Sequence, residues 1–209
     1  MVWAGCTAVG ASTAHALPLV PNGGFETPIL TPGSSAKLPN TTPDIAWAGS
    51  GAQGVEIFTS GFFPGLIAYE GNQFGEVQND ALTETLSQTV SGFLVGKPYN
   101  FFFAHRGRGG TDTVKFEVMD GGTSIFNSNY STDNSAWDLK TGIFTPTSAN
   151  LQIVFTGVNS VDPSGQPGVG NFIDAVSFSE VPGPLPLMGA ASAFAFSRRL
   201  RRRISKARS

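Results

Sequence analysis

Cysteine, histidine and charged residues are all scarce in this 209-residue chain. With one Cys and two His, it can form neither an internal disulfide nor a zinc centre built from several Cys and His ligands. Charged residues make up 13% of positions, and 26 Gly and 14 Pro interrupt the sequence, which disfavours a helical bundle. The 17 Phe supply a substantial core, so the composition predicts an all-β domain of short strands and turns rather than a disordered chain.

The charged residues are divided unevenly along the chain. Residues 198–209 hold seven of the 13 basic residues and no acid, which leaves six basic residues against all 15 acidic ones in residues 1–197. Because an acidic surface repels phosphate backbones, we expect no nucleic-acid partner for this body. The same charge is compatible with a hard cation such as calcium.

The N-terminal residues 1–16 contain no Lys, Arg, Asp or Glu and end in Ala14-His15-Ala16. The two alanines match the pattern of a signal-peptidase site, so we expect a signal peptide over 1–16 and a mature chain that begins at Leu17. Its removal also removes Cys6, the single thiol. The alternatives are a disordered apolar leader and a lipoprotein box at Trp3–Cys6.

The C-terminal residues combine a proline motif, an apolar stretch and an arginine cluster. Residues 181–197 are 17 uncharged positions, at the short edge of the ~17–25 residues that span a bilayer. The arginines that follow mark a cytoplasmic end by the positive-inside rule. The residues that define this pattern are Val181, Pro182, Gly183, Pro184, Arg198 and Arg199.

This tail resembles the PEP-CTERM sorting signal of exopolysaccharide-producing bacteria, although Gly183 stands where that family has Glu. The resemblance implies a short hydrophobic helix, transient inner-membrane anchoring through residues 185–197, and recognition by an exosortase, a membrane protease-transferase. It further implies that residues 17–180 are delivered to the cell surface or the extracellular matrix. The alternative is a permanent C-terminal membrane anchor with a stop-transfer cluster.

The body, residues 17–180, shows apolar–polar alternation between turn signals and no sustained helical period. Eight or nine short strands at this spacing predict a β-sandwich, and specifically a jelly roll. The strands we expect are 55–59, 66–70, 85–90, 99–106, 113–119, 124–127, 137–145, 151–156 and 172–180.

Two of these strands can be assigned faces from their alternation. In 99–106 we expect Tyr99, Phe101 and Phe103 in the core, and Phe102, Ala104 and Arg106 on the opposite face. In 113–119 we expect Val114, Phe116 and Val118 to be buried. If the two strands form a hairpin through residues 107–112, Arg106, Lys115 and Glu117 share one open sheet face.

Four segments of the body are similar to galactose-binding-like jelly rolls of bacterial surface proteins: 20–26, 68–77, 103–113 and 170–178. The resemblance implies that the first and last strands lie side by side and hold a structural calcium ion. Its ligands are then Glu26, Asp174 and a backbone carbonyl such as that of Gly24, which suits the oxygen preference of calcium. The alternative is that the two carboxylates cap or pair at a strand edge.

Carbohydrate binding is the leading functional hypothesis, because sugar sites combine aromatic platforms with polar side chains. The candidate ligand-binding residues are Trp47, Tyr69, Phe74, Glu76, Arg106 and Arg108. Each has a structural alternative: the aromatic residues as core, Arg106 paired with Glu117, and Arg108 shaping a turn with Asp112.

Two other classes of function stay open. No G-x-S-x-G motif is present, and His105 is the one histidine left after signal removal, so we expect a non-catalytic protein. A glycoside hydrolase acting through paired carboxylates is the enzymatic alternative, with candidates Glu56, Glu70, Glu76 and Glu84. A structural matrix or adhesion component without a dedicated small ligand is the third.

Overall fold

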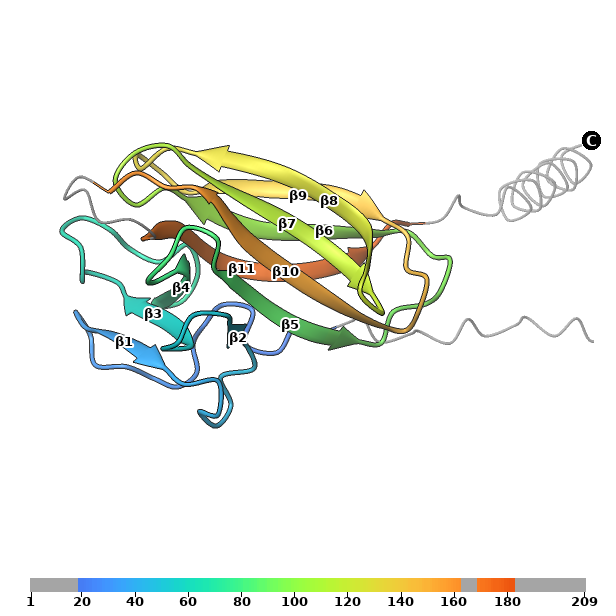
Figure 1. Cartoon of the computed structure of the whole chain (residues 1–209), viewed down its shortest axis with the longest axis horizontal. Coiled ribbons are helices and arrows are strands. Elements are labelled where there is room, and N and C mark those ends of the chain that lie inside the picture. Colours follow the sequence, from blue (N-terminus) through green and yellow to red (C-terminus); the bar gives the residue numbers. More distant parts are fainter. Residues whose placement is uncertain (1–18, 163–168, 183–209) are drawn as a thin grey trace, which may run out of the picture.

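A computed structural model describes residues 19–162 and 169–182, which form two antiparallel sheets packed face to face (Figure 1). The six-stranded sheet has the order β1 (Ser35–Leu38), β3 (Val55–Thr59), β4 (Gln73–Gln78), β11 (Gly170–Glu180), β6 (Tyr99–Arg106) and β9 (Asp138–Phe144). The five-stranded sheet has the order β2 (Ala48–Gly49), β5 (Thr85–Ser91), β10 (Asn150–Asn159), β7 (Asp112–Asp120) and β8 (Thr123–Thr132).

The predicted all-β sandwich is confirmed. Within the described ranges, no helix is long and apolar enough to cross a membrane. The predicted signal peptide, the hydrophobic helix and all of the sorting tail beyond Pro182 lie outside the described residues.

The core lies between the two sheets and is mainly aromatic. Phe101 and Phe103 of β6 are buried, as the alternation predicts, and so is Phe116 of β7. The ring centroids of Phe101 and Phe116 lie 4.7 Å apart, and those of Phe103 and Phe155 lie 5.0 Å apart, so these rings join the sheets. Full burial of one such side chain contributes about 1.5–3 kcal/mol, which makes this row a main source of stability.

The predicted hairpin between 99–106 and 113–119 is wrong. β6 pairs with β11 and β9, whereas β7 pairs with β10 and β8 in the other sheet. Arg106 and Glu117 therefore lie in different sheets and on opposite faces of the sandwich. Glu117 forms its ion pair within β7 instead, with Lys115 at 2.7 Å.

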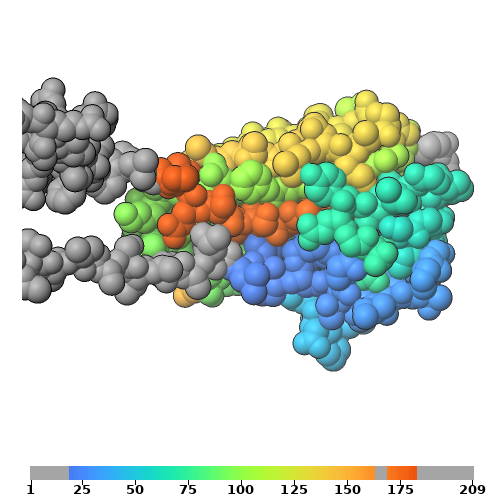
Figure 2. All heavy atoms as spheres, turned by 180° about the vertical axis from the view of Figure 1, so that it is seen from behind, coloured from blue at the N-terminus to red at the C-terminus, as the bar shows by residue number. Residues whose placement is uncertain are grey.

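A second aromatic cluster covers part of the outer face of the six-stranded sheet. Phe58, Phe74 and Phe172 come from the adjacent strands β3, β4 and β11 and are almost fully buried. Residues 60–72, which we call the covering segment, lie over them through Phe63 and Leu66. Figure 2 shows this face, with the covering segment in teal beside the orange β11.

The covering segment explains the wrongly predicted strand at 66–70. Leu66 and Ala68 are buried while Ile67 and Tyr69 are exposed, which is the alternation of a half-buried strand. The segment nevertheless joins neither sheet, because it lies flat on the aromatic cluster. Strands β1, β2 and β4 were not predicted from the sequence.

A bulge in β11 sets the direction of its side chains. The register against β6 shifts between Asp174 and Ser177, and Ala175 has a φ of 51°. Val176 donates its backbone N–H to the carbonyl of Gly23 at 2.9 Å, so the first described segment runs beside the last strand. Around the bulge, Val176 and Phe178 face the core, whereas Ser177 is exposed.

Candidate functional site

Beyond the covering segment, the outer face of β11, β6 and β9 is open. Phe102 of β6 lies between Ser177 of β11 and Thr141 of β9 in the register of the sheet, and Asn100 lies between Ser179 and Ile143. Because alternate residues of β6 face the core, these side chains face outward. We call this surface the outer strip. It consists of Asn100, Phe102, Leu139, Thr141, Ile143, Ser177 and Ser179.

An aromatic pair stands at one end of the outer strip. Tyr69 of the covering segment is 46% exposed, and its ring meets Trp137 edge to face at 6.5 Å. Trp137 is half-buried; it packs against Phe74 at 5.5 Å and donates its Nε1–H to the carbonyl of Ile67 at 2.8 Å. The pair is thus held by the cluster beneath it, while the Tyr69 ring reaches solvent.

The carboxylate of Asp174 fixes the backbone that carries Tyr69. Its Oδ2 accepts hydrogen bonds from the N–H groups of Tyr69 and Glu70, at 2.8 and 3.0 Å, and its Oδ1 accepts from Ala175 at 2.7 Å. Asp174 is fully buried, and this desolvation raises its pKa to about 7 even though the three N–H bonds act to lower it. The carboxyl therefore holds the covering segment on β11 through these hydrogen bonds.

Two of the predicted platform residues lie in the interior. Trp47 is 1% exposed, stacks on Phe25 at 5.2 Å and donates its Nε1–H to the carbonyl of Asn22. Phe74 belongs to the buried aromatic cluster. Because a platform needs an open ring face, the structure corrects the assignment of both residues and leaves Tyr69 as the exposed aromatic among those predicted.

The remaining predicted residues divide between surface and interior. Arg106 lies on the outer face, where its Nη2 donates to the carbonyl of Asn134 at 2.5 Å. Glu76 is buried and accepts two hydrogen bonds from Arg108, at 2.9 and 3.1 Å, and burial raises the pKa of this carboxyl well above its ordinary value. Arg108 also lies 5.1 Å from the centroid of the Phe63 ring, so this ion pair supports the covering segment from below.

The predicted calcium ligands also contact the covering segment. Glu26 Oε1 accepts hydrogen bonds from the N–H groups of Asn72 and Gln73, at 2.7 and 2.8 Å, next to the two N–H groups that Asp174 holds, so both carboxylates fix the C-terminal end of the covering segment. Calcium takes six to eight oxygen ligands. In residues 19–162 and 169–182, no three or more Asp, Glu, His or Cys side chains converge as a metal site. The carboxylates of Glu26 and Asp174 are bonded to backbone N–H groups here, and the calcium ion expected at Gly24, Glu26 and Asp174 stays a prediction.

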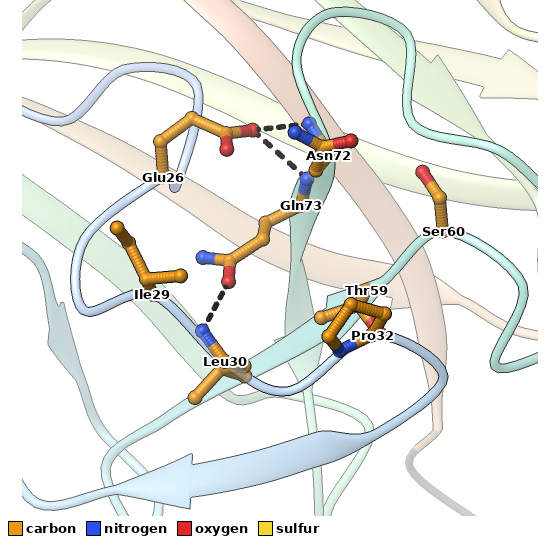
Figure 3. Close-up of a pocket in the computed structure, with 8 residues that line it drawn as sticks. All are labelled: Glu26, Ile29, Leu30, Pro32, Thr59, Ser60, Asn72 and Gln73. Carbon is orange, nitrogen blue, oxygen red and sulfur yellow. Dashed lines mark hydrogen bonds between the residues drawn. The ribbon is translucent and has the colours of Figure 1, made fainter.

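A cavity of about 300 Å³ lies beside Glu26. Figure 3 shows the residues that line it. Gln73 crosses its wall, where its Oε1 accepts a hydrogen bond from the N–H of Leu30 at 2.7 Å. The side chain of Ile29, at its mouth, is 90% exposed. None of the eight residues drawn there is aromatic, so the cavity offers no ring on which a sugar could stack.

His105 is not available to a ligand. It is fully buried, with Nδ1 at 2.9 Å from Thr132 Oγ1 and Nε2 at 2.8 Å from Asn171 Oδ1. Burial lowers its pKa to about 4, so the ring is neutral at physiological pH. Its role is to link β6, β8 and β11 in the interior.

Two residues of the candidate site were not assigned a functional role from the sequence. Trp137 was expected only as the start of a strand, and Phe102 only as facing away from the core. The sequence signal that could have found Trp137 is its place directly after the loop 133–136, because loops run over the surface and often carry binding residues. That Tyr69 meets Trp137 depends on the covering segment, which the sequence does not predict.

No protein-family model matches the sequence, and no curated protein matches it. Solved structures with similar folds do exist. A cyclase from Fischerella sp. TAU, solved with 4-(1H-indol-3-yl)butan-2-one, has a TM-score of 0.61 and 18% identity over 81% of this chain and 100% of that one. At this identity the similarity shows the fold alone.

Two further structures come from carbohydrate-active proteins. The tandem CBM22-1–CBM22-2 domain of Paenibacillus barcinonensis Xyn10C has a TM-score of 0.51 and 14% identity, over 84% of this chain and 49% of that one. The arabinose-bound MgGH51 α-L-arabinofuranosidase has a TM-score of 0.51 and 14% identity, over 79% of this chain and 27% of that one. The chain thus shares its β-sandwich with carbohydrate-binding modules and with at least one cyclase.

Proposed function

We propose that this protein is a non-catalytic module that binds extracellular polysaccharide on the outer strip. The observation that carries the proposal is the exposed Tyr69 ring, held against Trp137 beside a row of outward-facing hydroxyl and amide side chains. Sugars combine apolar C–H faces with hydroxyl groups, and such a surface complements both. The fold shared with carbohydrate-binding modules is compatible with this function.

In this proposal, one sugar ring packs against Tyr69 and the chain continues along β6. Phe102 offers a second, half-buried apolar surface. Asn100, Thr141 and Ser177 supply amide and hydroxyl groups that both donate and accept hydrogen bonds. All of these side chains project from strands, so the row is rigid and extended, which favours a polymer over a single small molecule.

The experiment is a glycan array probed with the intact chain and with two variants. Tyr69→Ala removes the exposed ring, and we expect at least tenfold weaker binding to the glycans that the parent protein recognises. Phe62→Ala is the matched control, because Phe62 is a 39% exposed aromatic of the same covering segment that contacts Phe58 and Phe63 instead of Trp137.

The array also separates the alternatives. If the parent protein binds none of the neutral or acidic glycans, the result contradicts the proposal and favours a matrix or adhesion component. Release of reducing sugar from a bound glycan favours a glycoside hydrolase. Equal loss of binding in Tyr69→Ala and Phe62→Ala places the glycan elsewhere than on the aromatic pair.

We also propose that the protein is exported and retained at the bacterial surface through its C-terminal tail. The support is the sequence pattern alone: the proline motif at 181–184, the uncharged run and the arginine cluster. Replacement of Arg198 and Arg199 by Gln in the native host, followed by cell fractionation, tests it. Loss of surface localisation supports an exosortase-type signal, and unchanged localisation contradicts it.

A further inference from the structure

The outer strip carries a row of exposed apolar side chains beside its polar ones. Leu139 and Ile143 of β9 are 45% and 56% exposed, and the half-buried ring of Phe102 lies beside them on β6. The open Tyr69 ring stands at the far end of the same face. A single exposed apolar residue is ordinary on a protein surface, whereas several on one face mark a surface that a partner covers.

The described chain ends at the other end of this strip. Ser179 of β11 belongs to the strip, and the next residue, Glu180, pairs with Tyr99 at the start of β6. The N–H of Val181 donates to the carbonyl of Pro98 at 3.0 Å, which fixes the point where the chain leaves the sheet. Figure 2 shows β11, in orange, open along this face. The residues that follow β11 therefore start next to the strip.

The sequence after β11 has the composition and the length to turn back over the strip. Pro182-Gly183-Pro184 consists of residues typical of turns. The run 185–197 that follows has 13 residues and no charge. As the helix expected from the sequence it would measure about 20 Å. The strip measures about 20 Å as well, from Asn100 to the level of Arg106 along β6.

Charge favours the same placement. Residues 198–209 hold seven basic residues and no acid, and they follow the apolar run, so they would reach the far end of the strip. Glu70, Asp133 and Asp138 are exposed carboxylates at that end. The basic residues there, Arg106 and Lys140, are bonded to backbone carbonyls. Because residues 1–197 contain 15 acidic residues against six basic ones, the body attracts this basic segment.

We infer that the apolar run 185–197 packs on the outer strip of the same molecule in the intact chain. Phe194 and Phe196, near the end of the run, would then lie against Tyr69 and Trp137. This docking does not depend on glycan binding, whereas its consequence rests on the function proposed above. The tail competes with polysaccharide for the strip and weakens binding without abolishing it, and removal of the tail frees the strip.

The test is site-specific photo-cross-linking of the purified intact chain. A photoreactive benzoylphenylalanine replaces Thr141, which is exposed in the middle of the strip. After illumination, mass spectrometry of the digest identifies the peptide joined to it, and we expect residues 185–197. The same amino acid in place of Thr89 is the matched control, because Thr89 is an exposed threonine on the outer face of the five-stranded sheet. It should capture no tail peptide.

Isotope labelling and tail variants make this test specific. In an equal mixture of ¹⁴N and ¹⁵N chains, we expect both linked peptides to carry the same isotope. Phe194→Asp with Phe196→Asp should abolish the cross-link, and Phe194→Leu with Phe196→Leu should keep it. If the chain altered at Thr141 does not fold, Ser177, also exposed on the strip, takes its place.

The inference is overturned if the strip position captures no tail peptide or if the Thr89 position captures it equally. It is also overturned if half of the linked peptides carry different isotopes, because the tail then comes from a second copy of the chain.

Glycan binding tests the consequence separately. The chain with both Phe→Asp changes should bind the glycans of the array at least threefold more tightly than the parent, and the chain with both Phe→Leu changes should bind as the parent does. Unchanged binding in the Asp variant would overturn the competition. Glycan binding without a tail cross-link overturns this inference alone. A tail cross-link in a chain that binds no glycan, with or without the Asp changes, overturns the proposed function alone.

Discussion

Asp174 accepts a hydrogen bond from the backbone N–H of Tyr69 across 105 residues of sequence, with an N···O distance of 2.8 Å. This bond and its companion to Glu70 position the exposed ring of the proposed site from the last strand of the fold. The covering segment joins neither sheet, so such side-chain bonds take the place of a strand ladder.

Asp174→Ala should therefore loosen the covering segment. It leaves the N–H groups of Tyr69, Glu70 and Ala175 without their acceptor, at a cost of about 1–3 kcal/mol for each that stays buried. We expect faster hydrogen exchange at Tyr69 and Glu70 and weaker glycan binding. Asp133→Ala, which removes an exposed loop carboxylate, is the control. Unchanged exchange at Tyr69 would show that Asp174 does not hold the covering segment on β11.

Trp47 and Tyr69 should respond in opposite ways to truncation. Trp47→Ala removes a buried ring stacked on Phe25, and we expect it to lower the free energy of unfolding by about 3–5 kcal/mol. Tyr69→Ala removes a ring that is nearly half exposed, so its cost should stay below about 1 kcal/mol while binding is lost. Urea denaturation of both variants measures the difference. A larger stability loss for Tyr69→Ala would overturn their assigned roles.

The strand 99–106 and the aromatic residues Trp47 and Tyr69 show what the sequence can and cannot predict. Alternation in 99–106 predicts the inward faces of Tyr99, Phe101 and Phe103, because a strand period depends on neighbouring residues alone. Which strands pair depends on long-range contacts, so the expected hairpin between β6 and β7 is wrong. Trp47 and Tyr69 both follow an alanine in turn-rich stretches, and nothing local distinguishes a core ring from a surface ring.

In the candidate site, too, the sequence predicts some of the surface residues, whereas long-range contacts decide which of the others are buried. Tyr69 and Arg106 are found on the outer face, as residues of a surface site should be. Phe74 and Glu76 were chosen for their residue type, but the covering segment and Arg108 bury them. Trp137 becomes a neighbour of Tyr69 because 60–72 folds across β11, a contact between parts of the chain 68 residues apart that no sequence period encodes.

His105 should make the protein less stable as the pH falls. The pKa of its ring is about 4 in the folded state against 6.5 unfolded, so the unfolded chain takes up the proton first. Stability from this group is complete above pH 6.5 and is lost toward pH 4, by about 3 kcal/mol. Asp174 has a raised pKa in the folded state, so its titration makes the protein more stable as the pH falls and opposes the effect of His105. The measurement therefore compares His105→Gln with the parent, because both contain Asp174.

We expect the parent's advantage in unfolding free energy over His105→Gln to fall by about 3 kcal/mol between pH 7 and pH 4. Urea titrations across this range measure it. A constant difference would mean that His105 has the same pKa in the folded and the unfolded chain.

Calcium removal tests the metal prediction separately. Both oxygens of Asp174 and one of Glu26 already accept backbone N–H bonds, so we expect EDTA to leave the melting temperature unchanged to within about 1 °C. A rise of several degrees on adding calcium, absent in Glu26→Gln, would instead support the calcium site expected from the sequence.

The central claim is that polysaccharide lies on the outer strip, and a hydrogen-exchange footprint of the best glycan from the array tests it most directly. We predict slower exchange in residues 67–70 and along β6, β9 and β11 when the glycan is bound. Exchange in those strands and in the covering segment that is identical with and without a saturating glycan would contradict the account.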